Sequence, residues 1–352
     1  MFRFLFIIII SIHSAYAANH CVILQYHHFS TETPPITSIS PQQFDDQLDY
    51  LQRNNFKILP LRKVIYQLQN QLELPDKCIS LSIDDAYISI YQNAYPRLKK
   101  LGWPATVFVN TDAVDAGLKS TMNWQQMREM SQYGFSFENH SHSHLHMIRK
   151  KHNESDSAWL KRVQQDIQTA QNRILAEIGV QPTLLAYPYG EYTAELIELI
   201  TSMGLVGFSL QSGPVWPGAN FGALPRFPME SQYANMEGFI TKVNSLPLPI
   251  TAVFPRDPLV EPGQTRPVLK IQLPPELQAD KKLRCYVSSS DQVDISWSDT
   301  DPGWLQISPK FDLSPGRHRT NCTMPSSQPT RFHWYSHSWY VRHDDGKWYA
   351  EY

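Results

Sequence analysis

The pentapeptide Ile83–Tyr87 reads IDDAY, and about fifty residues later the hexapeptide Asn139–His144 reads NHSHSH. Carboxylates and imidazoles are the ligands that hold a catalytic divalent ion, and hydrolysis also needs a base that is not consumed in holding it. Neighbouring side chains diverge at the end of an extended strand, so one aspartate can face a metal while the other faces the attacking water. The alternative is a purely structural role, in which Asp84 and Asp85 cap a following helix. The histidine cluster favours a hydrolytic metal site.

These residues resemble three motifs of the polysaccharide deacetylases of the chitin and chitooligosaccharide deacetylase superfamily, carbohydrate esterase family four. The family's first motif is an apolar or aromatic residue, Asp-Asp and usually Gly, and Ile83–Ala86 matches it with Ala86 at the last position. The second, His-Ser/Thr-x-x-His, is matched by residues 140–144. The third, Arg-x-Pro-x-Gly, is matched by residues 186–190, which read AYPYG and lack the arginine. The resemblance covers roughly residues 20 to 245 in the expected order.

The family order implies a role for each matched residue. Asp84 takes the place of the general base, and Asp85, His140 and His144 take the places of the metal ligands. Tyr189 occupies the position associated with stabilising the oxyanion. The implied cofactor is a divalent metal, with zinc favoured and cobalt, nickel or manganese compatible with the same ligands. Ser141 is expected to hydrogen-bond locally and shape the histidine loop.

The sequence leaves two interpretations open for each of three assignments. Arg226, near the last predicted strand, is the candidate to replace the arginine missing at Ala186 and to orient Asp84; otherwise it is an ordinary surface or interdomain arginine. His27, just past the first predicted strand, is the candidate acid for the leaving group, alone or with His28, unless it is a buried, hydrogen-bonded histidine. If this histidine segment is extended, the ring of His142 faces the same side as those of His140 and His144. His142 and His146 therefore remain alternative metal ligands.

The chain of 352 residues exceeds the usual size of one hydrophobic core and predicts two domains. Residues 1–17, with Arg3, an apolar run and Ala15-Tyr16-Ala17, read as a signal peptide, so a periplasmic or secreted location is expected. An uncleaved signal segment is the one membrane attachment considered. The net charge of −2 argues against nucleic-acid binding.

Four cysteines in an exported chain suggest disulfides, with Cys21 and Cys78 as one pair and Cys285 and Cys322 as the other. Cys21 lies six residues before His27, and Cys78 lies six before Asp84. If both segments are neighbouring parallel strands, the two sulfurs lie at one level. The alternative for this pair is two buried free thiols.

Residues 18–245 alternate apolar runs with amphipathic helices, which is typical of a parallel α/β sheet or barrel. The family resemblance implies a distorted β/α barrel. Its predicted strands are Val22–Tyr26, Ile79–Ile83, Ala105–Val109, Phe135–Glu138, Thr183–Tyr187 and Leu205–Ser209. The candidate site residues follow these strands, and the carboxyl ends of parallel strands share one face.

A proline-rich stretch, residues 246–275, predicts a linker, and residues 276–352 predict a small all-β, sandwich-like domain. The predicted strands are Leu269–Leu273, Leu283–Val287, Val293–Trp297, Phe332–Tyr335 and Trp339–Val341. The domain's tryptophans are expected to pack in its core rather than to form a carbohydrate platform; they are Trp297, Trp304, Trp334, Trp339 and Trp348.

The resemblance implies metal-dependent removal of N-acetyl groups from a polysaccharide that contains N-acetylhexosamine. One alternative is an ester deacetylase of an O-acetylated glycan, since the same attack on an acyl carbon serves both substrates. A second alternative, from a different class, is a glycan-binding protein without catalysis. Ala86 and Ala186 favour that alternative, and the retained aspartates and histidines oppose it.

Overall fold

A parallel sheet that curves into a barrel forms the first part of the chain in the computed structural model, which describes residues 19–278 and 282–350. The strand order is β10-β1-β5-β6-β7-β8-β9, and β4 pairs with β5. The strands are β1 (Val22–Tyr26), β4 (Lys57–Ile58), β5 (Cys78–Asp84), β6 (Ala105–Val109), β7 (Phe135–Asn139), β8 (Leu184–Ala186), β9 (Val206–Phe208) and β10 (Phe227–Pro228). The predicted signal peptide, residues 1–17, lies outside the described residues.

Hydrogen bonds from the segment before β10 return the sheet toward its first strand. Leu224 donates to the carbonyl of Gly207, and its own carbonyl accepts from Ser209, at the end of β9. Three residues later, β10 pairs with β1 at Leu24 and Phe227. The predicted distorted β/α barrel is confirmed, and its closing segment carries Arg226.

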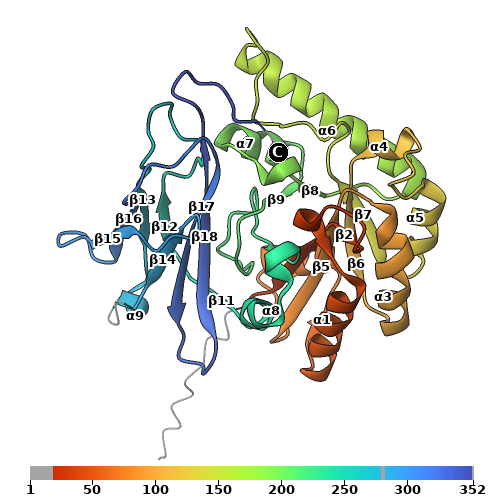
Figure 1. Ribbon diagram of the computed structural model, residues 1–352, viewed down its shortest axis with the longest axis horizontal. Helices are drawn as coiled ribbons and strands as arrows, with labels where there is room; N and C mark the ends of the chain where they lie inside the picture. Colours follow the sequence, from red (N-terminus) through yellow and green to blue (C-terminus); the bar gives the residue numbers. More distant parts are fainter. Residues whose placement is uncertain (1–18, 279–281, 351–352) are drawn as a thin grey trace, which may run out of the picture.

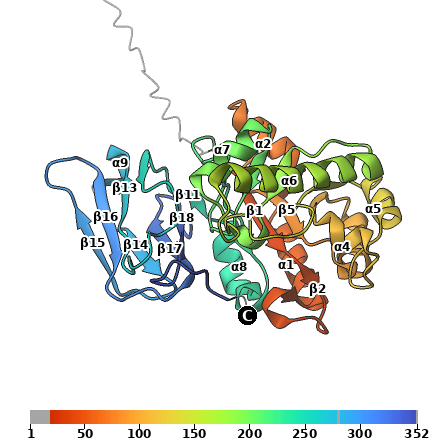
Figure 2. The same ribbon diagram turned by 90° about the horizontal axis from the view of Figure 1, so that it is seen from above.

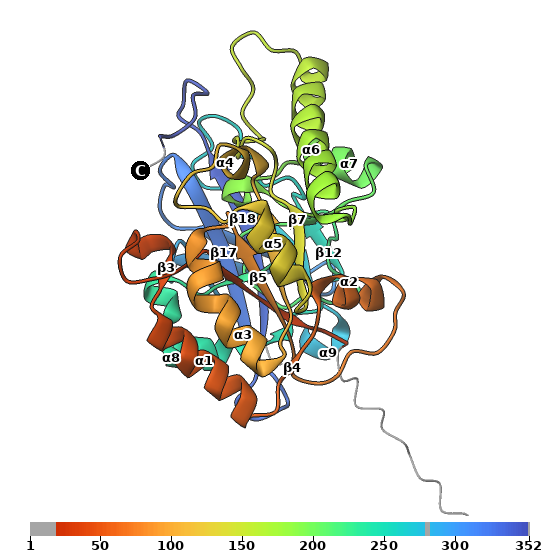
Figure 3. The ribbon, with the colours of Figure 1, turned by 90° about the vertical axis from the view of Figure 1, so that its right-hand side faces the viewer.

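Helices cover the outside of the barrel, with α1, α3 and α5 on the side away from the second part of the chain (Figure 1, Figure 3). The helices of this part are α1 (Pro41–Arg53), α2 (Leu61–Gln69), α3 (Tyr95–Leu101), α4 (Thr111–Asp115), α5 (Trp124–Ser131), α6 (Asp156–Ile178), α7 (Ala194–Ser202) and α8 (Met236–Val243). Ser40 and Gln43 cap α1 reciprocally, and α6 ends at Gly179, whose φ of 81° suits a residue without a side chain.

Two four-stranded sheets form the second part of the chain, to the left of the barrel in Figures 1 and 2. Their orders are β11-β18-β17-β14 and β12-β13-β16-β15. The strands are β11 (Leu246–Pro247), β12 (Ala252–Phe254), β13 (Leu269–Gln272), β14 (Arg284–Val287), β15 (Val293–Trp297), β16 (Trp304–Pro309), β17 (Gly316–Pro325) and β18 (Phe332–Val341); a short helix, α9 (Pro275–Gln278), follows β13. Apolar residues of both sheets share one buried cluster, so the predicted sandwich-like domain is confirmed.

The stretch predicted as a linker, residues 246–275, contributes β11, β12 and β13 to the sandwich. Its prolines break helices, but they tolerate short strands at sheet edges and strand starts, as Pro247 shows in β11. We therefore propose that the second structural unit begins at Leu246. Strands β11, β12, β16 and β17 were not predicted from the sequence, and the two predicted strands at residues 332–335 and 339–341 are one strand, β18.

Strand β18 joins the two units because both of its faces are covered. Trp339 and Val341 point into the sandwich core, whereas Trp334 packs edge-on against Phe227 of the barrel, with 5.2 Å between ring centroids. On the barrel side, the hydroxyl of Tyr340 donates to the carbonyl of Gly190 at 2.8 Å. Of these two tryptophans, Trp339 packs in the sandwich core as expected, whereas Trp334 packs against the core of the barrel.

Both expected disulfides are present, Cys21–Cys78 and Cys285–Cys322. Cys78 begins β5, and the chain of Cys21 leads directly into its neighbour β1. The free-thiol alternative for this pair is therefore excluded in this structure. Among the described helices, none is long and apolar enough to cross a membrane.

Candidate metal centre and active site

The two aspartates leave the end of β5 in different directions. Asp84 is the last residue of the strand, whereas Asp85 and Ala86 have φ values of 72° and 52°. This left-handed conformation costs non-glycine residues about 1–2 kcal/mol each and explains why the related motif prefers glycine at the position of Ala86. Hydrogen bonds hold the turn: Asp85 N–H donates to the carbonyl of Phe108, and Met122 N–H donates to that of Ala86.

Asp85, His140 and His144 converge on one point. The Nε2 atoms of His140 and His144 lie 3.4 and 3.3 Å from Oδ1 of Asp85. Ligand atoms about 2.0–2.1 Å from a tetrahedral zinc ion would lie about 3.3 Å from one another. Oδ1 of Asp85 is buried and accepts no hydrogen bond within the described chain, an arrangement that is costly unless a cation is bound. These three residues fit a divalent metal.

The loop after β7 orients both imidazoles. Nδ1 of His140 lies 2.8 Å from the carbonyl of Ala186, so this nitrogen is the donor and Nε2 carries the lone pair that faces Asp85. Ser141 and His144 both have positive φ, and the hydroxyl of Ser141 accepts from the backbone N–H of His144 at 2.9 Å. The local hydrogen bond expected of Ser141 is confirmed.

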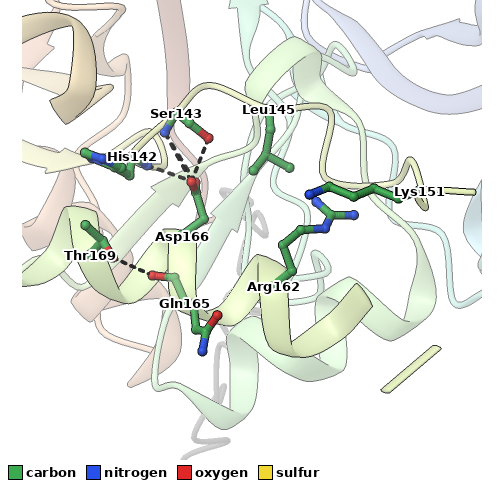
Figure 4. Close-up of a pocket in the computed structure, with 8 residues that line it drawn as sticks. All are labelled: His142, Ser143, Leu145, Lys151, Arg162, Gln165, Asp166 and Thr169. Carbon is green, nitrogen blue, oxygen red and sulfur yellow. Dashed lines mark hydrogen bonds between the residues drawn. The ribbon is translucent and has the colours of Figure 1, made fainter. Parts of the chain in front are cut away.

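The other two histidines of the cluster turn elsewhere. Nδ1 of His142 lies 2.8 Å from the hydroxyl of Thr111, and its backbone N–H donates to Asp166 of α6. His142 lines a separate pocket of about 470 Å³ over α6 (Figure 4). His146 stacks on Tyr189 with 3.7 Å between ring centroids, and its Nδ1 lies 2.8 Å from Oε2 of Glu191. The segment is therefore not an extended His-x-His-x-His strand.

Asp84 is held by Arg226 through a two-pronged ion pair inside the barrel. Nη1 and Nη2 of Arg226 donate to Oδ1 and Oδ2 of Asp84 at 2.7 and 2.8 Å. Burial raises the pKa of Asp84, but the charge and the hydrogen bonds of Arg226 bring it below its usual value. The contact required for Arg226 to replace the missing arginine is present, and it reaches Asp84 from the closing segment.

His27 points its two ring nitrogens at two different partners. Nδ1 lies 2.5 Å from Oε1 of Glu230, and Nε2 lies 4.0 Å from Oδ2 of Asp85. Burial lowers the pKa of His27, but the charge and hydrogen bond of Glu230, together with the charges of Asp85 and Asp84, outweigh it and raise that pKa to about 9. Sequence reasoning missed Glu230, although it follows β10 by two residues and so shares the strand-end signal of the other site residues. The neighbouring His28 stacks on Tyr87, with 3.6 Å between ring centroids.

Tyr189 lies in the tight turn after β8, beside His144. Its φ is 59°, and its ring centroid lies 4.8 Å from that of His144. Pro188 has no N–H, and the N–H groups of Gly190 and Glu191 donate to carbonyls of the same turn. A side chain at position 190 would collide with Leu210, since an added Cβ would lie 2.5 Å from its Cγ. Glycine is therefore required there, and Tyr189 stays the candidate for stabilising the oxyanion because of its position in the third motif.

Comparison with known proteins agrees with this geometry. Residues 71–208 match the family model described as polysaccharide deacetylase. The poly-β-1,6-N-acetyl-D-glucosamine N-deacetylase of Staphylococcus aureus is 26% identical over 230 residues, which are 60% of this chain and 79% of that protein. YxkH of Bacillus subtilis is 28% identical over 182 residues, 52% of this chain, and the match spans only 61% of YxkH.

Two solved structures share the fold. The Streptococcus pyogenes deacetylase PplD in complex with acetate has a TM-score of 0.58 at 22% identity, with 64% of this chain and 99% of that chain covered. IcaB from Ammonifex degensii has a TM-score of 0.55 at 23% identity, with 62% and 94% covered. These structures show the deacetylase fold in the barrel, and residues 71–208 match the polysaccharide deacetylase model, as the motifs predicted.

Proposed function

We propose that this protein is a metal-dependent hydrolase that removes N-acetyl groups from a polysaccharide containing N-acetylhexosamine. The observation that carries the proposal is the contrast at the end of β5. The buried Oδ1 of Asp85 faces two imidazole nitrogens and has no hydrogen bond among the described residues, whereas the adjacent Asp84 is fully paired with Arg226. One carboxylate is thus available to a cation, and the other is held in place as a base.

A divalent ion held by Asp85, His140 and His144 would polarise the acyl group and lower the pKa of a water molecule. Zinc suits these ligands, and cobalt, nickel or manganese are alternatives that metal analysis would separate. Asp84 would accept the proton of the attacking water. Its low pKa keeps it ionised at neutral pH, and the two bonds from Arg226 fix its orientation.

His27 is proposed as the acid that protonates the leaving nitrogen. Its Nδ1 is taken by Glu230, so Nε2 carries the transferable proton and faces the ligand cluster. With a pKa of about 9, His27 is protonated at neutral pH. The N–H of Tyr189 is proposed to stabilise the oxyanion, as a fixed donor in a turn that Gly190 makes possible.

The proposed substrate is a polymer of N-acetylglucosamine, and the β-1,6-linked form is the first to test. This choice is supported by the name of the Staphylococcus aureus relative. The two disulfides support the proposal that the protein works outside the cytoplasm, in the periplasm or secreted.

Acetate release tests the proposal directly. The purified protein is incubated with β-1,6-linked N-acetylglucosamine oligomers and, in parallel, with an O-acetylated xylan, each with and without a chelator. The proposal expects acetate and free amine from the oligomers, abolished by chelation and restored by zinc. Acetate from the xylan alone would favour the ester deacetylase, and binding of the oligomers without acetate release would favour the glycan-binding alternative.

A further inference from the structure

A buried carboxylate of the barrel, that of Glu191, contacts both structural units. Glu191 follows Gly190 of the third motif directly and has no exposed surface. Its Oε2 lies 2.8 Å from Nδ1 of His146, in the loop that carries the candidate metal ligands. Its Oε1 lies 3.2 Å from Nη1 of Arg317, on strand β17, and also accepts from the hydroxyl of Tyr349. Burying such an anion is costly unless donors surround it, and here both units supply donors.

His146 connects this carboxylate to Tyr189, the candidate for stabilising the oxyanion. The rings of His146 and Tyr189 stack, with 3.7 Å between centroids and 9° between planes. The ring of Tyr189 also meets that of His144 edge-on, with 4.8 Å between centroids. Because Tyr189 has a φ of 59°, contacts around it must hold a backbone conformation that is unfavourable for this residue. His146 is therefore placed to fix Tyr189 beside a candidate metal ligand.

The sandwich reaches the same turn through two neighbouring strands. The guanidinium carbon of Arg317 lies 5.5 Å from the ring centroid of Tyr189, within the range of a cation–π contact. Arg317 is paired with Tyr340 of β18, whose hydroxyl donates to the carbonyl of Gly190 at 2.8 Å. Tyr340 packs in a cluster of barrel side chains, so this face of the two strands meets the barrel. Arg317 thus contacts both the buried carboxylate and the ring of Tyr189.

Tyr349, which follows β18, closes this network against the histidine loop. The residue is 7% exposed, and its hydroxyl donates to Glu191. Its carbonyl accepts from Nη1 of Arg149 at 3.2 Å, and the guanidinium carbon of Arg149 lies 4.9 Å from its ring centroid. The guanidinium carbon of Arg317 lies 5.8 Å from the same ring. The second unit therefore holds Glu191 at more than one point, and removal of one contact should leave the carboxylate partly supported.

The position of a group that stabilises an oxyanion matters to within about an ångström. Donors act when they lie about 2.7–3.1 Å from the oxyanion, and a misplacement of about 1 Å can cost about a hundredfold in rate. In amide hydrolysis, water adds to the acetyl carbon, negative charge develops on the acetyl oxygen, and the carbon–nitrogen bond breaks as the nitrogen takes up a proton. A group that stabilises this charge acts in the transition state, so its displacement changes kcat more than KM.

We propose that Glu191 and Arg317 are positioning residues for deacetylation. Together with His146, they hold Tyr189 in place beside the candidate metal centre. The sandwich thereby completes the active site of the barrel, through contacts to the turn at residues 188–191 rather than through the metal ligands themselves. This inference rests on the proposed function, and it assigns a catalytic purpose to the interface between the two units.

Kinetics on a pentamer of β-1,6-linked N-acetylglucosamine tests this role. Arg317→Met should lower kcat about tenfold or more, with KM changed less than about twofold and bound zinc unchanged. Glu191→Gln, which keeps the shape of the side chain and removes its charge, should lower kcat in the same way. Arg317→Lys retains a cation beside Glu191 and should recover part of the loss. Arg284→Met, which changes an exposed arginine on β14, is the matched control and should leave kcat unchanged.

A double-mutant cycle tests whether Arg317 acts through Tyr189. Tyr189→Ala removes the ring, so Arg317→Met should have little further effect on kcat in that background. In the metal-free protein, denaturant unfolding of the same four proteins should also show non-additive losses, since the two side chains are in contact. If Arg317→Met does not fold, Tyr349→Phe, which removes one hydroxyl from the network, tests the same role through a smaller fall in kcat.

The outcomes separate failure of the positioning role from failure of the proposed function. An active parent enzyme whose kcat changes less than about twofold in Arg317→Met and Glu191→Gln would overturn the positioning role and leave the deacetylase intact, even if unfolding is non-additive. Equal losses of kcat from Arg317→Met with and without the ring of Tyr189 would overturn the action through Tyr189. A folded, zinc-loaded parent protein that releases no acetate would overturn the proposed function itself, and the positioning role with it.

Discussion

The ligand cluster and the proton-transfer pairs of this site are built in opposite ways. The ligand cluster comprises Asp85, His140 and His144; the proton-transfer pairs are Asp84 with Arg226 and His27 with Glu230. In the cluster, a buried carboxylate oxygen faces two imidazoles without a hydrogen bond among the described residues. In the pairs, each acidic or basic group has an opposite charge within 2.7 Å.

This difference separates two tasks that the same residue types can perform. A cluster whose lone pairs have no hydrogen-bond donor can bind a cation, and the bound cation offsets the free-energy cost of burying those unpaired polar atoms. In a pair, each charged group has a partner of opposite charge, and this partner fixes both its pKa and its orientation. The account therefore expects substitutions in the cluster to remove the metal, and substitutions in the pairs to leave it in place.

The largest effect is expected in the ligand cluster. His140→Ala removes one of the ligands, and we expect loss of bound metal together with a fall of deacetylation to background. Metal content is measured by elemental analysis after dialysis, alongside acetate release. His142→Ala is the matched control from the same loop, since His142 bonds to Thr111, and it should keep both metal and activity. A metal-loaded, active His140→Ala protein would contradict the assigned cluster.

A smaller loss of activity is expected when the first proton-transfer pair is broken. Arg226→Met should lower kcat about ten- to a thousandfold with metal content intact, because Asp84 loses the partner that orients it. It should also destabilise the fold by about 3–5 kcal/mol, because a buried charge is left unpaired. Denaturant unfolding of Arg226→Met with Asp84→Asn is the control: removing both charges should restore much of the stability. Unchanged turnover in Arg226→Met would reject the orienting role.

The smallest effect, a shift in pH dependence, is expected at the second pair. His27 is needed in its protonated form, and its pKa is raised to about 9, first of all by Glu230, so kcat/KM should decline above about pH 9. Glu230→Gln removes the charge and should move this alkaline limb down by about one pH unit or more.

The free energy of unfolding should also depend on pH through the protonation of His27. A histidine whose pKa is raised in the folded state stabilises the fold most below its unfolded pKa of about 6.5, and this contribution is lost as the pH rises through about 9. Thermal unfolding of wild type and Glu230→Gln should therefore differ more at pH 6 than at pH 10. Identical pH–rate profiles in the two proteins would remove Glu230 from the proton-transfer pairs.

The ligand cluster was predictable from the sequence, whereas the pairs were predictable only in part. Asp84, Asp85, His140 and His144 lie in short motifs at strand ends, and the carboxyl ends of parallel strands converge without further information. Arg226 became a candidate only because the third motif of this chain has Ala186 where the family has an arginine. Glu230 had no motif, and its partner His27 is 203 residues away.

The sandwich was harder to predict in detail for a related reason. Strand β17 reads as a polar segment because Arg317, Arg319 and Asn321 alternate with its buried residues. Its polar face lies against the barrel rather than against solvent, and residues 336–338 look like a break in β18 for the same reason. Local pattern identifies a strand by one apolar face, and an interface between two units hides that signal.

The adjacent aspartates offer the most direct test of the contrast between the cluster and the pairs. Asp84→Asn and Asp85→Asn lie at adjacent positions and remove the same charge. A difference in the amount of zinc bound per protein therefore reflects the different roles of the two aspartates. We predict that Asp84→Asn retains about one zinc ion and Asp85→Asn retains almost none, while both lose deacetylation. Loss of zinc from Asp84→Asn with retention in Asp85→Asn would contradict the account.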